Sequence, residues 1–305
     1  MSGERSLEQV KAEILRRAGR NSPLEHITPE DAQAAVAALT SLDRDHWAEV
    51  WCTIGLRHEA RGDALQQQGA AAEAASAAWF MAYANCRTGR YPVASTPGKM
   101  AAYQHSLRCF RKAACSFKSP LEVVEFPCAG KRLTGYLQVP TGCVRPPVVI
   151  HWGGVDGWKE DRQRNSEILH DHGFATLTMD MPGTGENPVG YMTPDAERTF
   201  SAAIDWLSSR DDVDSSRIGV WGGSFGGYWA AKLAHVESAR ISAAVIQNMI
   251  MRCPCLPDAD GGVRGVPVRW PRVRGRFQWF GVEPETRGTA RRRAGPGWGP
   301  ARAGS

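Results

Sequence analysis

The sequence predicts an α/β fold, in which a doubly wound, mostly parallel sheet follows a helical N-terminal region. Residues 1–118 carry apolar residues at helical spacing, whereas residues 119–251 alternate short apolar strands with amphipathic helices. Such alternation places helices on both faces of parallel strands. The composition changes again at residue 252, so we expect three segments: 1–118, 119–251 and 252–305.

The first segment is expected to be a cap-like helical region. Apolar residues recur at helical intervals in five stretches: 6–18, 32–39, 41–68, 69–86 and 99–116. Thr28 followed by Pro29 is a typical helix start, because the threonine can cap the helix and proline fits its first turn. An array of helical repeats is the alternative interpretation, although the stretches share no fixed period.

The second segment is expected to supply the sheet. Its predicted strands are 121–126, 132–139, 147–152, 175–179, 217–221 and 240–247. Its predicted helices are 160–172, 196–208 and 225–236. The first two strands form a hairpin around Ala129-Gly130, and 147–152 is continuously apolar, as in a buried parallel strand. Ligands of such sheets bind at the carboxyl ends of the strands.

The most informative motif is Gly222-Gly223-Ser224-Phe225-Gly226. It lies between a predicted strand and a predicted helix, and G-x-S-x-G in that context predicts a nucleophile elbow that presents Ser224. Gly222 and Gly226 are required because a Cβ there would clash with neighbouring elements. A structural Gly/Ser turn is the alternative, since a chain with 32 glycines produces this pattern by chance.

A second glycine motif follows the strand 147–152. His151 and Trp152 lead into Gly153-Gly154-Val155. The backbone N–H of Gly154 or Val155, together with that of Phe225, is expected to form an oxyanion hole, where small residues let a substrate carbonyl approach the backbone. An ordinary glycine turn is the alternative.

Residues 90–250 resemble the α/β-hydrolase superfamily, and more narrowly the group of FrsA-like esterases, dihydroxypseudooxynicotine hydrolases and fungal polyketide-shortening hydrolases. The matching stretches are 153–160, 180–186 and 222–226. The resemblance implies that a Ser-Asp-His triad without cofactor or metal hydrolyses an ester, or a ketone-adjacent C–C bond, of a small-molecule substrate. It implies a turn-fixing role for Asp180 rather than that of the catalytic acid.

The chain departs from this family after the serine. The triad of this fold runs Ser, then Asp or Glu, then His, but the last histidine of the chain is His235, in the helix that follows Ser224. The last strands of the sheet have no counterpart after Asn248, so a partial α/β-hydrolase sheet is expected. His151 is an alternative base, but a packing role is favoured. Without a base the serine is a weak nucleophile, and we expect impaired activity.

The segment 252–305 accounts for the basic charge of the chain. Its eleven arginines and four carboxylates give this segment a net charge of +7. The whole chain has a net charge of +5, so the remaining residues carry −2. Its Arg/Gly/Pro-rich composition predicts a disordered segment. Such a composition also indicates a gene read in a shifted frame, which would leave the hydrolase domain truncated. An RNA-binding tail is the disfavoured alternative. Its carboxylates are poor candidates for the triad acid: Asp258, Asp260, Glu283 and Glu285.

Composition limits the remaining possibilities. The chain is 42% hydrophobic and has no apolar run of the roughly 18 residues that a membrane span needs. Its eight cysteines are scattered without a CxxC pair, so neither a metal site nor a disulfide framework is indicated. We therefore expect a cytoplasmic protein, with a homodimer left open. A non-catalytic binding or scaffold protein that kept the front half of the fold is the main alternative function.

Overall fold

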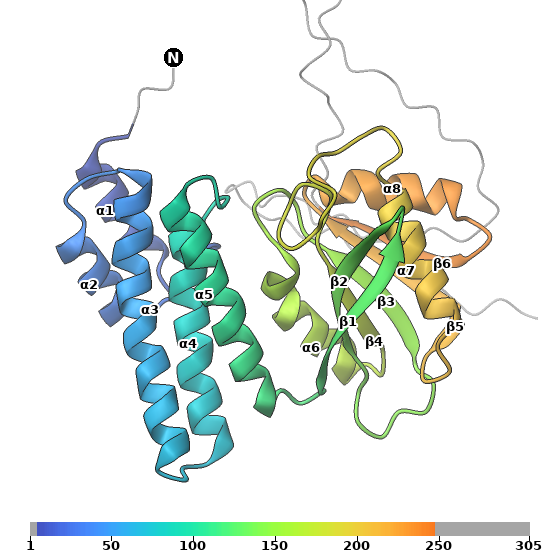
Figure 1. The fold of residues 1–305 in the computed structure, drawn as a ribbon, viewed down its shortest axis with the longest axis horizontal. Helices are drawn as coiled ribbons and strands as arrows, with labels where there is room; N and C mark the ends of the chain where they lie inside the picture. Colours follow the sequence, from blue (N-terminus) through green and yellow to red (C-terminus); the bar gives the residue numbers. More distant parts are fainter. Residues whose placement is uncertain (1–4, 248–305) are drawn as a thin grey trace, which may run out of the picture. The chain divides into compact units, whose positions relative to one another are not determined.

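The computed structural model describes residues 5–247 (Figure 1). The helical region consists of α1 (Leu7–Arg17), α2 (Pro29–Ala38), α3 (Arg44–Gln67), α4 (Ala72–Arg90), α5 (Pro97–Ala113) and the short 3₁₀ helix η1 (Ala114–Ser116). Each of the five predicted helical stretches is present. Ser6, Thr28 and Thr96 each accept a hydrogen bond from the backbone N–H three residues on, which caps α1, α2 and α5. The predicted helix start at Thr28-Pro29 is confirmed.

Helix α4 is the most deeply buried element of this region. Every residue from Ala82 to Arg90 is buried, because α4 packs against both α3 and α5. Trp51 of α3, Tyr83 of α4 and Phe110 of α5 belong to one hydrophobic cluster.

The predicted mostly parallel sheet is confirmed (Figure 1). Its strands are β1 (Leu121–Cys128), β2 (Lys131–Gln138), β3 (Pro147–Trp152), β4 (Ala175–Met179), β5 (Asp214–Gly223) and β6 (Ile241–Gln247). Their order in the sheet is β1-β2-β4-β3-β5-β6. β2 pairs antiparallel with β1 and β4, whereas β4, β3, β5 and β6 run parallel.

The helices of the second segment are η2 (Lys159–Arg162), α6 (Gln163–Asp171), α7 (Arg198–Ser208) and α8 (Gly226–Val236). The helix predicted over 160–172 therefore divides into a 3₁₀ turn and a shorter α-helix. Lys159 is the first residue of η2, and its backbone N–H, which has no acceptor within the helix, donates to Asp180 Oδ1 at 2.8 Å. In the confirmed hairpin, Ala129 and Gly130 have φ of 47° and 77°, the left-handed pair that suits a two-residue turn.

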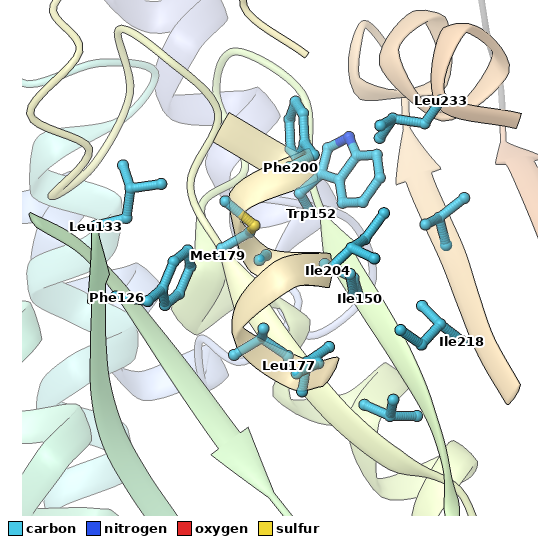
Figure 2. Close-up of a cluster of buried hydrophobic side chains, with 14 of the residues drawn as sticks. Phe126, Leu133, Ile150, Trp152, Leu177, Met179, Phe200, Ile204, Ile218 and Leu233 are labelled. Atoms are coloured by element: carbon cyan, nitrogen blue, oxygen red, sulfur yellow. The ribbon is translucent and has the colours of Figure 1, made fainter. Parts of the chain in front are cut away.

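The core of the second segment lies between the sheet and the helices α7 and α8 (Figure 2). Ile150, Leu177 and Ile218 enter it from β3, β4 and β5, and Phe200 and Leu233 enter it from the two helices. Since side chains alternate along a strand, the neighbouring positions of β3 point to the other face of the sheet.

The expectations on membrane spans, metal sites and disorder concern the whole chain, whereas the structure describes residues 5–247. Within residues 5–247, none of the helices is both long and apolar enough to span a membrane. The same residues contain no group of three His, Cys, Asp or Glu side chains placed to hold a metal ion. The predicted disordered segment 252–305 lies outside the described residues.

Leu177 offers a direct test of this core, because its side chain is fully buried in β4. We expect Leu177→Ala to lower the free energy of unfolding by about 2–5 kcal/mol, through lost burial and the cavity left behind. Urea denaturation followed by circular dichroism measures this. Leu56→Ala is the control, since Leu56 is 42% exposed on α3 and should cost much less. Equal losses in both variants would contradict the packing described here.

Candidate active site

Ser224 occupies the junction between β5, which ends at Gly223, and α8, which begins at Gly226. Its φ of 54° lies in the left-handed region, a conformation that costs a non-glycine residue about 1–3 kcal/mol. The Ser224 backbone N–H donates to Gln247 O at 2.8 Å, which ties the turn to the end of β6. The exposed side chain of Ser224 thus stands at the carboxyl end of the sheet, with the geometry expected of a nucleophile elbow.

The two elbow glycines are fixed by contacts between backbones. A Cβ added at Gly222 would overlap the carbonyl oxygen of Gly226. A Cβ added at Gly226 would overlap the carbonyl oxygen of Gly153 and lie 2.7 Å from Cδ1 of Trp152. The strand, the turn and the loop after β3 therefore meet at a distance that only glycine permits.

The loop after β3 lies directly against Ser224. A Cβ added at Gly154 would lie 2.9 Å from Cβ and 3.1 Å from Oγ of Ser224. Within the described residues, the backbone N–H groups of Gly154, Val155 and Phe225 have no hydrogen-bond acceptor. The structure thus brings together the residues named as oxyanion hole and nucleophile, and their chemical roles stay predictions.

His151 lies on β3, three positions before Gly154, and makes no hydrogen bond to Ser224. Its ring is fully buried and stacks on Trp221, with centroids 4.3 Å apart and planes at 10°. Neither ring nitrogen hydrogen-bonds to a described residue. Burial, and secondarily the charge of Arg162, hold the pKa of His151 well below its usual range, so the ring is neutral. These contacts agree with the packing role favoured from the sequence.

Asp180 is fully engaged by its own turn. Its Oδ1 accepts from the backbone N–H of Lys159, and its Oδ2 accepts from Lys159 Nζ at 2.8 Å and from the backbone N–H of Glu186 at 2.9 Å. The carboxylate therefore has the structural surroundings of a turn-fixing residue, as expected.

The described residues supply no general base to Ser224. Its Oγ makes no hydrogen bond to any histidine or carboxylate between residues 5 and 247. His235 is exposed near the end of α8, and the nine residues from Gly226 place it about 14 Å further along the helix, at roughly 1.5 Å per residue. The four acidic residues of the tail, Asp258, Asp260, Glu283 and Glu285, lie outside the described residues.

One set of buried charges near the site was missed from the sequence. Arg87 and Arg90 of α4 both pair with Asp161, which follows the loop that carries Gly154. Burial opposes ionisation of Asp161, but the two arginines outweigh it, and the pKa of Asp161 lies below its usual range. No spacing in the sequence indicates this contact, because its partners are 71 and 74 positions apart.

Comparison with known proteins adds an independent observation. The sequence model of the family described as "Esterase FrsA-like" matches residues 28–258, three quarters of the chain. The chain belongs to the FrsA-like esterase family. This matched region takes in most of the helical segment as well as the sheet.

Individual relatives agree with this membership. The chain is 30% identical over 203 residues to esterase FrsA of Vibrio vulnificus, covering 66% of this chain and 48% of that protein. It is 34% identical over 137 residues to the 2,6-dihydropseudooxynicotine hydrolase of Paenarthrobacter nicotinovorans, covering 45% of this chain and 37% of that one. The chain thus spans about half the length, or less, of these curated relatives.

Solved structures share the fold of this FrsA-like chain. The 2,6-dihydroxy-pseudo-oxynicotine hydrolase matches with a TM-score of 0.64 and 23% identity, over 78% of this chain and 64% of that one. AbyA5 matches with a TM-score of 0.59 and 21% identity, over 75% and 60% of the two chains. The predicted α/β-hydrolase fold is therefore confirmed.

The glycine contacts at the elbow can be tested by stability. We expect Gly222→Ala to lower the free energy of unfolding by about 1–3 kcal/mol, because the new methyl group would overlap the backbone of α8. Gly190→Ala is the matched control, since a Cβ there meets nothing within 4 Å. Chemical denaturation of both variants decides the question. A Gly222 variant as stable as the control would show that the elbow is looser than described.

Proposed function

We propose that this FrsA-like chain is a serine hydrolase in which Ser224 is the nucleophile, acting on an ester or a ketone-adjacent C–C bond of a small molecule. The observation that carries the proposal is the left-handed Ser224 at the β5–α8 junction, placed against the loop of Gly154 and Val155. Family membership supports the same class of reaction.

In the proposed reaction, Ser224 Oγ attacks the substrate carbonyl carbon, and its proton passes to water because the described residues supply no base. The carbonyl oxygen becomes negatively charged and accepts hydrogen bonds from the backbone N–H groups of Phe225 and of Val155 or Gly154. Within the described residues these groups have no other acceptor, so they are available to stabilise the charge as it develops. Collapse of the tetrahedral intermediate breaks the C–O or C–C bond to the leaving group, which takes a proton from water as it departs. Water then hydrolyses the acyl-enzyme, which releases the acid and restores the Ser224 hydroxyl.

We propose further that turnover by the 305-residue chain is impaired. Its last histidine is His235, which lies too far along α8 to take the serine proton. Loss of the base in such a triad lowers kcat by about 10⁴- to 10⁶-fold and leaves the contributions of the oxyanion hole and of substrate binding.

The absence of a base beside Ser224 in the described residues also supports a second candidate, a non-catalytic binding protein built on the same fold. The two candidates differ in what they require of Ser224. An impaired hydrolase keeps a serine that a strong electrophile modifies selectively, whereas a binding protein does not need one.

A fluorophosphonate probe separates these candidates. We expect slow modification of Ser224 alone, identified by peptide mass spectrometry and abolished in Ser224→Ala. Hydrolysis of p-nitrophenyl butyrate should exceed that of Ser224→Ala by no more than about tenfold, because the base is missing.

Two outcomes would contradict parts of the proposal. No modification of Ser224 after prolonged exposure would favour the binding protein. Rapid ester turnover that disappears in Ser224→Ala would confirm the hydrolase and overturn the impairment, because a base would then be supplied from outside residues 5–247.

A further inference from the structure

The carboxyl end of α4 contacts the loop that carries the proposed oxyanion hole. Arg90 is the last residue of α4 and is 1% exposed. We infer that Arg90 is a positioning residue, which fixes the loop 153–158 so that the N–H groups of Gly154 and Val155 face Ser224. This inference rests on the proposed function for its catalytic consequence, but the contacts themselves stand independently.

The guanidinium of Arg90 joins three parts of the chain. Its Nη1 donates to the carbonyl oxygen of Asp156 and to that of Pro92, both at 2.9 Å. Its Nη2 donates to Asp161 Oδ2 at 2.8 Å. A planar fork with several donors in fixed directions suits this task, and a lysine ammonium offers no equivalent.

The rest of the loop is held by groups that Arg90 also contacts. Arg90 Cζ lies 3.7 Å from the centroid of the Trp158 ring, which packs edge-on against Tyr103 at 4.5 Å. The Trp158 indole N–H donates to the carbonyl oxygen of Val155 at 3.1 Å, and its backbone N–H donates to Asp161 Oδ2 at 2.8 Å. Next to Arg90, the Tyr91 hydroxyl donates to Asp156 Oδ2 at 2.9 Å.

These contacts hold the chain next to Gly154 and Val155. The carbonyl oxygens of Val155 and Asp156 are both held, and planar peptides fix the N–H groups of Asp156 and Gly157 that follow them. The Gly154 N–H shares its planar peptide with the carbonyl oxygen of Gly153, which lies against Gly226. On the other side, a Cβ at Gly153 would overlap the carbonyl oxygen of Gly157, so the loop closes tightly on itself. With both ends fixed, the Gly154 and Val155 peptides have little freedom to turn away from Ser224.

Arg87 provides a matched control for a purely structural role. It lies on the same helix, is 2% exposed and pairs with the same carboxylate, Asp161. Its other hydrogen bonds go to Pro23 O, Glu25 and Ser22 in the helical region, and none goes to the loop 153–158. Loss of a buried guanidinium paired with Asp161 is therefore common to the lysine variants of both arginines, whereas loss of the loop contact is specific to Arg90.

The test compares Arg90→Lys with Arg87→Lys in the full chain, by hydrogen exchange and by Ser224 modification. Hydrogen exchange of a peptide covering 153–162 reports the order of the loop and does not require activity. Hydrogen exchange of β4 reports global unfolding and serves as the reference. We expect Arg90→Lys to speed loop exchange about tenfold relative to β4, and Arg87→Lys to change that ratio less than about twofold.

The second readout is the rate constant for fluorophosphonate modification of Ser224. We expect a loss of about 10- to 100-fold in Arg90→Lys, because displacement by about 1 Å has an effect of this size, and little change in Arg87→Lys. If wild-type Ser224 is not modified at all, the proposed function fails while the exchange readout still tests the positioning role.

Tyr91→Phe is a milder variant in case Arg90→Lys does not fold. It removes only the hydrogen bond to Asp156 Oδ2 from a partly buried side chain, and we expect about threefold faster loop exchange. Equal ratios of loop exchange to β4 exchange in the Arg90 and Arg87 variants would overturn the inference. If Arg90→Lys is unfolded, wild-type loop exchange in Tyr91→Phe would overturn it instead.

Discussion

The arrangement around Ser224 depends on a close approach of backbones. Gly222, Gly226 and Gly153 lie where the end of β5, the start of α8 and the loop after β3 meet, and no side chain fits between them. Because these three elements come from separate parts of the chain, the sheet must bring β3 and β5 side by side for the contact to exist. Their parallel pairing does so, with Trp152 opposite Gly222. The strained backbone of Ser224 is held at this point by its hydrogen bond to the end of β6 and by the loop after β3.

Buried charges link two of the loops around this site. Lys159 is fully buried among Glu160, Asp180 and Glu186, each within 2.8 Å of its Nζ. Burial works against the charge of Lys159, yet the neighbouring carboxylates outweigh it, and the pKa of Lys159 lies well above its usual range. Such ion pairs add little net stability, but breaking one partner leaves an uncompensated buried charge. They therefore specify which segments must meet, and here they link the turn after β4 to the loop after β3.

The sequence predicts the parts of this molecule that depend on local pattern. The strands 147–152 and 175–179 were predicted with their observed bounds, because a buried parallel strand is a continuous apolar run between turn residues. The elbow was located because its glycines and serine are adjacent in the chain. Arg90 and Asp161 were missed, since their contact joins distant positions and buried charges contradict the usual rule that charged residues are exposed. The helix predicted over 160–172 is observed as η2 followed by α6, a division that the spacing of apolar residues does not indicate.

In the proposed site, the backbone near Gly154 and Val155 forms an oxyanion hole with Phe225 around the Ser224 nucleophile. A crystal structure of the chain after reaction with diethyl p-nitrophenyl phosphate tests it most directly. We expect a diethyl phosphoryl group on Ser224 Oγ, with its phosphoryl oxygen about 2.7–3.1 Å from the Phe225 nitrogen and from that of Val155 or Gly154. A phosphoryl oxygen directed to solvent, or a phosphoryl group attached to another residue, would contradict the account.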